Sequence, residues 1–217
     1  MISSAFAMPP MKSNDPFVPN LGQYELNFAY IVENSQNSSS QARILDFNYG
    51  IIKNVQVTFE TAYVINNTIE DLDAFEVSMK WLAYQGTFFS FAVEPKYKFF
   101  PYSSAFDQGD TFGLSIPMSF QFFSKLVFMF DPKIIFPSGQ DSYIKLGNLI
   151  NYQHNVHNFF FEIYLTQVPN AQNIYLVKFG YAYQIRQNFN AMISYAEPLF
   201  TNTTLSNEIY TGLQIIF

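Results

Sequence analysis

Residues 23–33 read Gln-Tyr-Glu-Leu-Asn-Phe-Ala-Tyr-Ile-Val-Glu, and this stretch decides the fold class. Large apolar side chains stand at alternate positions, at Tyr24, Leu26, Phe28, Tyr30 and Val32. Strict alternation is typical of a β-strand with one apolar and one polar face, whereas a helix would repeat about every 3.6 residues. The stretch therefore predicts a strand whose two faces meet different surroundings.

The same alternation recurs in roughly twelve segments, most of them close to the length that a tilted strand needs to cross a bilayer. The segments lie near residues 23–33, 45–49, 55–63, 75–81, 89–99, 111–122, 126–134, 144–151, 158–166, 175–184, 189–195 and 208–217. An even number of antiparallel strands can close into a barrel and so leave no unpaired edge in lipid. We expect an all-β fold, a closed antiparallel transmembrane β-barrel over residues 22–217.

The links between the segments alternate in length. Tight links follow the even-numbered segments, at 51–53, 85–87, 123–125, 153–155 and 186–187. Long polar links follow the odd-numbered segments, at 34–41, 66–73, 101–110, 137–142, 167–172 and 198–207. Bacterial barrels have short periplasmic turns and longer extracellular loops. The pattern therefore predicts a Gram-negative outer-membrane protein with both termini in the periplasm.

Composition supports a wall with lipid on one side and water on the other. The 217 residues include 19% aromatic and only 13% charged side chains, yet the mean hydropathy is +0.03. No run of about 18 apolar residues could form a transmembrane helix. The absence of cysteine excludes disulfide scaffolds and thiolate metal sites. A net charge of −6 without a basic stripe argues against nucleic acid as a partner.

Some features fit a barrel less well. Three prolines, Pro95, Pro117 and Pro132, fall inside predicted strands, and each removes one ladder hydrogen bond. Either bulges absorb them or the strand boundaries differ there. Because the chain has one Trp, tyrosines would have to form the aromatic girdles, at Tyr30, Tyr49, Tyr63, Tyr97, Tyr183 and Tyr195.

The first residues carry two further expectations. Ala5-Phe6-Ala7 has the small-x-small form of a signal-peptidase site, so we expect residues 1–7 to be the remnant of a signal peptide, with an ordinary disordered start as the alternative. Residues 8–21 are Pro-rich and polar and show no strand pattern. They either hang in the periplasm or lie in the lumen as a small plug.

The last strand resembles the C-terminal signal that the outer-membrane assembly machinery reads. That signal has an aromatic or polar residue, a glycine, a hydrophobic residue and a terminal aromatic at fixed spacing, which here are Tyr210, Gly212, Ile215 and Phe217. The alternative is an ordinary last strand that ends in Phe. The resemblance implies the assembly machinery and outer-membrane lipid as partners.

A second resemblance covers most of the chain. Residues 21–27 (Leu-Gly-Gln-Tyr-Glu-Leu-Asn) and 45–50 (Leu-Asp-Phe-Asn-Tyr-Gly) resemble the first strands of the MetA-pathway of phenol degradation family of outer-membrane proteins. Later segments keep the family's order, at 54–60, 75–81 and 92–95. The family's Leu-Pro-Thr-Gly turn is poorly kept, at 100–102 and 136–139, and beyond about residue 140 only the barrel pattern matches. The family is loosely described as transporters of small compounds, which implies a small-molecule solute.

Strand alternation assigns a set of charged residues to the lumen. The hypothesis is that these line a pore: Glu25, Asp46, Glu60, Glu76, Lys80, Glu94, Lys96, Lys98, Lys125, Asp131, Lys133, Lys145, Glu162 and Lys178. Acids dominate the first four strands and lysines the next four, which would create a transverse field across the pore. Alternatively the charges pair, Glu76 and Lys80 with Glu94 and Lys96, and merely fill a narrow interior. Inward apolar side chains could either hold an aromatic or apolar solute or pack together, at Met129, Tyr143, Phe160, Tyr164, Met192 and Tyr210.

These expectations favour a porin-like channel that transports small molecules passively. The alternative is a structural or surface-interaction barrel that acts through its outer loops. An enzyme is disfavoured because the only histidines, His154 and His157, lie at a predicted tight turn and no catalytic motif occurs. We expect no catalytic residues, no metal site and no cofactor.

Overall fold

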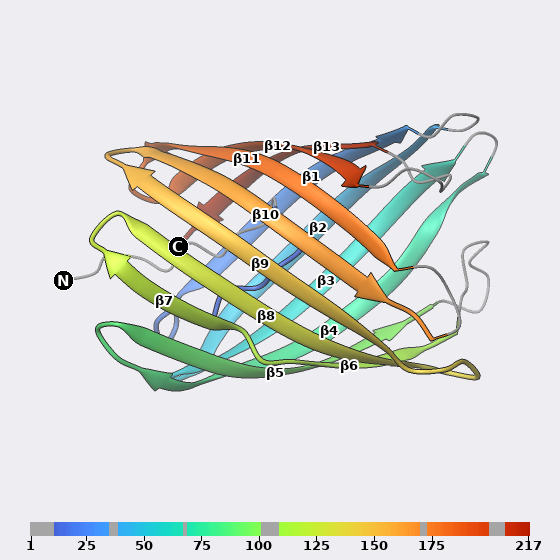
Figure 1. Cartoon of the computed structure of the whole chain (residues 1–217), viewed down its shortest axis with the longest axis horizontal. Coiled ribbons are helices and arrows are strands. Elements are labelled where there is room, and N and C mark those ends of the chain that lie inside the picture. The colour runs from blue at the N-terminus through green and yellow to red at the C-terminus, as the bar shows by residue number, and fades with distance from the viewer. Residues whose placement is uncertain (1–10, 35–38, 67–68, 101–108, 170–172, 200–206) are drawn as a thin grey trace.

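A computed structural model describes residues 11–34, 39–66, 69–100, 109–169, 173–199 and 207–217 (Figure 1). Within these residues the chain forms a 13-stranded sheet, and no helix there is long and apolar enough to cross a membrane. The strands are β1 (Tyr24–Asn34), β2 (Ser39–Ile52), β3 (Val55–Asn66), β4 (Ile69–Gln85), β5 (Phe89–Phe99), β6 (Thr111–Ser115), β7 (Met118–Phe123), β8 (Leu126–Pro137), β9 (Tyr143–His154), β10 (His157–Gln167), β11 (Ile174–Arg186), β12 (Phe189–Leu199) and β13 (Asn207–Ile216).

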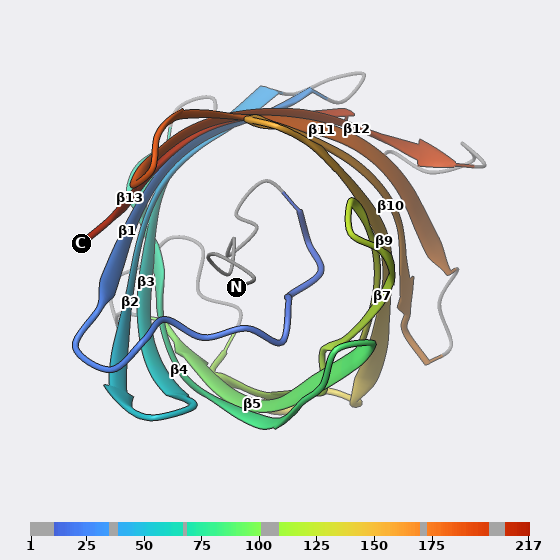
Figure 2. The same ribbon diagram turned by 90° about the vertical axis from the view of Figure 1, so that its left-hand side faces the viewer.

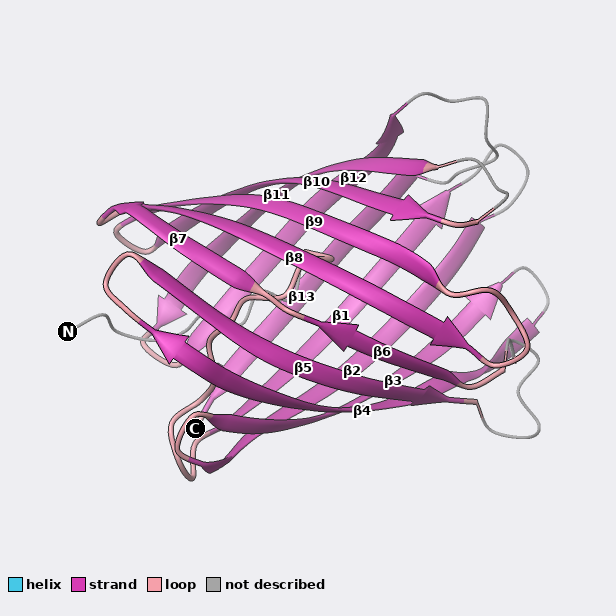
Figure 3. Cartoon of the chain, turned by 60° about the horizontal axis from the view of Figure 1, so that its bottom comes forward, coloured by secondary structure: helices cyan, strands magenta, loops and turns pink. Residues whose placement is uncertain are grey.

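The sheet closes on itself (Figures 2 and 3). Each strand pairs antiparallel with its neighbours, and β1 pairs with β13 from Glu25 opposite Ile216 to Asn34 opposite Asn207. Strands β6 and β7 both pair with β5 on one side and β8 on the other, so they are two halves of one barrel strand. The predicted closed antiparallel barrel of twelve strands is therefore confirmed.

The prolines interrupt three adjacent strands at one place. Pro117 lies between β6 and β7. The ladder between β4 and β5 is interrupted beside Pro95, and the ladder that β6 and β7 form with β8 is interrupted beside Pro132. Individual bonds bridge the gap, since Ala92 N donates to Pro117 O at 2.9 Å and Ile116 N donates to Pro132 O at 3.0 Å. The sixth predicted strand is thus divided in two, because proline cannot donate to the ladder.

Short links gather at one end of the barrel, called the turn end here, and the other links lie at the opposite loop end. The turn-end links are 53–54, 86–88, 124–125, 155–156 and 187–188. Asn54 (φ 65°) and Asn155 (φ 55°) adopt the left-handed conformation that such turns require. One predicted loop is wrong: β4 begins at Ile69, so most of 66–73 is strand that pairs with β3. Likewise β2 begins at Ser39.

The two faces of the wall follow the predicted alternation. Large apolar side chains on the outer face are exposed, among them Phe59 and Trp81 at 52% each. Inward positions are instead buried and mostly polar, as with Asn27 and Gln56. Five of the six proposed girdle tyrosines are 38–46% exposed on the outer face, namely Tyr30, Tyr49, Tyr97, Tyr183 and Tyr195. A surface this apolar is suited to lipid rather than water.

Replacing Phe59 by lysine tests this assignment. If the outer face is solvated by acyl chains, a cation near mid-strand costs about 2–4 kcal/mol and lowers the yield of folding into lipid vesicles. The matched control is Ala62→Lys, three positions along the same strand on the lumenal face, where the effect should be much smaller. Heat-modifiable migration on gels reports folding. Equal yields for the two variants would contradict lipid solvation of the outer face.

Candidate functional site

Residues 11–21, called the plug segment here, run inside the ring of strands (Figure 2). Met11, Ser13, Asp15 and Pro16 are buried. The carboxylate of Glu162 on β10 accepts hydrogen bonds from the backbone N of Lys12 at 3.0 Å and of Ser13 at 2.6 Å, and from Ser13 Oγ. Of the two sites that the sequence leaves open for this segment, these contacts favour the lumen.

Further contacts tie the plug segment to several strands. Asn14 donates from its backbone N to Asp131 Oδ2 on β8 and from Nδ2 to Glu94 Oε2 on β5, both at 2.6 Å. Lys12 forms an ion pair with Glu208 on β13 at 3.0 Å, and its carbonyl accepts from Lys133 Nζ at 2.8 Å. The segment therefore spans the lumen and is bound on more than one side.

Three glycines in the wall make room for the plug segment. A Cβ at Gly50 on β2 would overlap the backbone oxygen of Asn20. A Cβ at Gly147 on β9 would overlap the Ser13 side chain, and a Cβ at Gly180 on β11 would overlap Met11 Cε. None of the three glycines has a positive φ, so close approach rather than backbone conformation explains the absence of a side chain. The wall is therefore shaped to the docked segment.

Apolar side chains fill the lumen beside the plug segment. Met11 belongs to a buried cluster with Met129, Leu149, Phe160, Ala182, Met192 and Tyr210. A second cluster joins Tyr164 to Leu176 and Ala196. Of the six inward apolar residues predicted from sequence, four belong to the Met11 cluster and one lies in the second cluster. The Tyr143 ring lies 5.5 Å from Lys145 Nζ. With the plug segment docked, these packed side chains fill this side of the lumen.

Most of the predicted pore-lining charges do lie on the inner face. The acids Glu25, Asp46, Glu60 and Glu76 come from β1 to β4, and the lysines Lys80, Lys96, Lys98, Lys133, Lys145 and Lys178 come from β4 to β11, with Glu94, Asp131 and Glu162 among them. Lys125 differs, because it is exposed in the turn between β7 and β8 rather than in a strand. Alternation along a strand does not apply to a turn residue, so that prediction is corrected.

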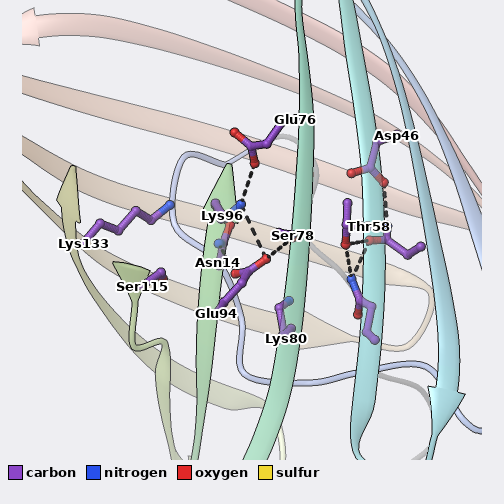
Figure 4. A network of polar contacts seen from close by, with 12 residues as sticks. Asn14, Asp46, Thr58, Glu76, Ser78, Lys80, Glu94, Lys96, Ser115 and Lys133 are labelled. Atoms are coloured by element: carbon purple, nitrogen blue, oxygen red, sulfur yellow. Dashed lines mark hydrogen bonds and ion pairs between the residues drawn. The ribbon is translucent and has the colours of Figure 1, made fainter. Parts of the chain in front are cut away.

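Several of these charges pair, as Figure 4 shows around β4 and β5. Lys96 lies 3.0 Å from Glu76 and 3.5 Å from Glu94. Lys80, expected from sequence to join this group, instead lies 3.9 Å from Asp15 of the plug segment. Lys133 pairs with Asp131 at 3.0 Å, and Lys178 pairs with Glu208. The sequence could not reveal the pairs with Asp15 and Lys12, because the segment that supplies them has no strand pattern.

Among the described residues, cavities remain along the opposite wall. An inner chamber of about 160 Å³ lies between the plug segment and strands β1–β5. A loop-side cavity of about 280 Å³ adjoins it and shares Ile44, Glu60 and Glu76. A turn-side cavity of about 640 Å³ is lined by residues 17–21 together with Glu25 and Lys53, among others. The open space therefore lies on the acidic side of the barrel, on both sides of the plug segment.

The plug segment carries its own buried charge. Burial raises the pKa of Asp15 to about 6, opposed by Lys80 and by the hydrogen bond from Phe17 N at 2.8 Å. The second oxygen, Asp15 Oδ2, is buried without a hydrogen-bond partner. A carboxylate is thus held in the lumen beside the inner chamber.

The C-terminal residues close the barrel. The rings of Tyr24 and Phe217 stack at 4.9 Å, and Phe217 N donates to Tyr24 O at 2.8 Å. Tyr210 points inward over Gly212, where a Cβ would overlap its hydroxyl, and Ile215 pairs with Leu26. Recognition of these residues by the assembly machinery stays a prediction.

The two histidines of the chain lie at a turn. His154 and His157 face each other across the β9–β10 turn, and His157 Nδ1 lies 2.8 Å from Tyr181 Oη.

Comparison with solved structures finds the same barrel fold in other proteins. The chain is similar to an outer-membrane channel from Pseudomonas putida F1 (TM-score 0.74, 8% identity, 95% of this chain and 100% of that chain covered). It is also similar to the NanC porin (TM-score 0.70, 13% identity, 88% and 98% covered) and to the KdgM porin in complex with disordered oligogalacturonate (TM-score 0.69, 9% identity, 89% and 99% covered). No protein-family model matches the sequence, and no curated protein matches it. The likeness is one of fold, and the specific family resemblance noted above is not confirmed.

Proposed function

We propose that this protein is an outer-membrane channel for the passive passage of small molecules, narrowed by its own N-terminal segment. The observation that carries the proposal is the chain of cavities along β1–β5, lined by charged and polar side chains and located inside a wall with an apolar exterior. Space with a polar lining inside the wall, with lipid outside, is the arrangement through which solutes cross barrels.

The proposed orientation follows from the links. The turn end would face the periplasm and the loop end the outside, since bacterial barrels place their short turns in the periplasm. Both Tyr24 and Phe217 lie at the turn end, so the plug segment would enter the lumen from the periplasmic side. Solute identity is set by the lining of the cavities rather than by the fold.

Two other classes of function, a metal-dependent protein and a surface-interaction barrel, have less support. No group of three or more His, Asp or Glu side chains among the described residues is placed to hold a metal ion. The surface-interaction alternative depends on the outer loops, and residues 35–38, 67–68, 101–108, 170–172 and 200–206 lie outside the described residues. The cavities inside the barrel favour passage through the wall.

Single-channel recording in planar bilayers tests the proposal. The purified full chain and a variant without residues 8–18 are compared in the same lipid and salt. We expect discrete openings in both, small for the full chain and larger for the variant. If neither protein produces openings although both migrate as folded barrels, the channel function is refuted.

A further inference from the structure

The carboxylates of the lumen differ in whether a lysine neutralises them. Five lumenal lysines form ion pairs: Lys12, Lys80, Lys96, Lys133 and Lys178. Among the described residues, no ion pair involves the carboxylates of Glu25, Glu33, Asp46 or Glu60. Their polar contacts are neutral donors where they exist, such as Asn27 Nδ2 to Asp46 Oδ1 at 2.7 Å and Gln214 Nε2 to Glu25 Oε2 at 3.2 Å. Carboxyl groups without a lysine partner are therefore concentrated on this side.

The register places several of these carboxylates directly opposite one another. Asp46 on β2 pairs with Glu60 on β3, and Glu60 pairs with Glu76 on β4. Of the three, only Glu76 has a lysine partner, Lys96 at 3.0 Å. Like charges directly opposite on a sheet destabilise it. Such a row therefore costs stability unless a cation lies beside it.

The unneutralised carboxylates follow the cavities through the barrel. Glu25 lines the turn-side cavity, Asp46 and Glu60 line the inner chamber, and Glu60 and Glu33 line the loop-side cavity. These four residues come from three consecutive strands, β1 to β3. A solute that moves along the open side of the lumen would meet a carboxylate in each cavity.

Unpartnered polar atoms in the inner chamber give an independent indication of a ligand. Asp15 Oδ2, Asn27 Oδ1 and Tyr210 Oη line this chamber, are buried and have no hydrogen-bond partner. The three residues are only 2%, 4% and 3% exposed. The Asp15 and Asn27 oxygens can only accept hydrogen bonds, and the amide nitrogen of Asn27 is already committed to Asp46. Two acceptor oxygens of this chamber, Asp15 Oδ2 and Asn27 Oδ1, are therefore without a donor.

The loop-side cavity adds an apolar contribution. Beside Glu33, Glu60, Glu76 and Lys98 it is lined by small aliphatic side chains and one polar one, from Ile31, Ser40, Ala42, Ile44, Ala62, Val64 and Ala74. Its volume of about 280 Å³ adjoins the 160 Å³ of the inner chamber. A hydrated metal ion gains nothing from such a wall, whereas a short hydrocarbon body does.

We propose that the solute is a small organic cation, with an ammonium group that donates to Asp15, Asn27 and the Asp46–Glu60 pair while its hydrocarbon body lies against Ile44, Ala62 and Val64. This inference rests on the proposed channel function. In the inner chamber two lysines, Lys80 and Lys96, face five carboxylates, so an ammonium adds a third positive charge and three donors for the unpartnered acceptors. Glu33 and Glu25 extend the same attraction to the two mouths.

The test compares butylammonium with butyrate and 1-butanol, which share its hydrocarbon body. In bilayers, the reversal potential in a butylammonium chloride gradient should show cations permeating several-fold better than chloride. The Asp46→Asn/Glu60→Gln double variant should lose most of this preference while it still conducts. The control is Glu197→Gln, a carboxylate exposed on the outer face of β12, which should behave like the native chain.

A binding measurement separates this inference from conduction. Butylammonium should raise the unfolding temperature of the native protein in detergent, whereas butyrate, 1-butanol and potassium should not, and the double variant should not respond. Because the double variant removes like-charge repulsion, we expect it to fold.

Conductance with no cation preference, or a preference that the double variant keeps, overturns the organic-cation inference and leaves the channel function intact. If potassium raises the unfolding temperature as much as butylammonium does, the inference that the cation is organic is overturned. Absence of conductance in all variants defeats the channel function, and a butylammonium-specific shift would then still support the site.

Discussion

Removal of residues 8–18 is expected to raise single-channel conductance several-fold. The plug segment occupies the lumen with buried backbone and with the Met11, Ser13, Asp15 and Pro16 side chains. Without it, the inner and turn-side cavities would merge into one passage, and conductance rises with the cross-section of the narrowest point. The barrel should still close, because the β1–β13 register begins at Glu25 and Ile216. Equal conductance with and without the segment would contradict its role as the constriction.

A reversible lock gives the same test without a deletion. The chain has no cysteine, so Ser13→Cys with Gly147→Cys introduces a single possible disulfide. Ser13 Cβ lies 2.9 Å from the position of a Cβ at Gly147, close enough for a bond after a small adjustment. Oxidation should hold conductance at the low level, and reduction should raise it because the two new side chains collide. Each single cysteine variant serves as the control, and a double variant insensitive to reductant would contradict the docked position.

Replacing Glu162 by glutamine is expected to release the plug segment. Its carboxylate accepts two backbone hydrogen bonds and one from Ser13 Oγ, and it is fully buried. A hydrogen bond to a charged group contributes about 1.5–3 kcal/mol, so the loss of one alone shifts the docking equilibrium by about ten- to a hundredfold. The strand itself should tolerate the change, since glutamine has nearly the same shape.

Solvent access to the segment measures this release. Pro16→Cys places a thiol at a buried position that makes no side-chain hydrogen bond, and a maleimide too large for the closed lumen reports its exposure. Labelling should accelerate by about the same ten- to hundredfold in the Glu162→Gln background. Glu197→Gln should leave the rate unchanged. A rate that Glu162→Gln does not alter would show that the segment is held by other contacts.

The barrel could be predicted from sequence because its information is local. Alternation at Tyr24, Leu26 and Phe28 assigns each side chain to a face, and links such as 53–54 set the order of antiparallel neighbours. Where the local pattern fails, the prediction fails too. Lys125 lies in a turn, residues 69–73 continue β4 despite their polar sequence, and Pro117 divides a strand.

The candidate site could be predicted only in part from the sequence, because the residues that contact one another there are far apart in the chain. The hydrogen bond from Lys12 to Glu162 joins residues 150 positions apart, and that from Asn14 to Glu94 joins residues 80 apart. The plug segment has no periodicity, so nothing in its sequence indicates which wall it contacts. Gly50, Gly147 and Gly180 are traces of its position, and a single sequence does not show why those positions lack a side chain.

The anchor of the plug segment at Gly22 has a consequence for the timing of opening. Gly22 N donates to Gly50 O at 2.9 Å, which fixes one end of the segment to the rim. Eleven residues in an extended conformation reach at most about 36–40 Å, farther than the apolar band of a barrel of about 25 Å. An undocked segment can thus swing clear of the mouth yet stays tethered at an effective concentration in the millimolar range. Each departure should be brief, and the current should flicker rather than stay on.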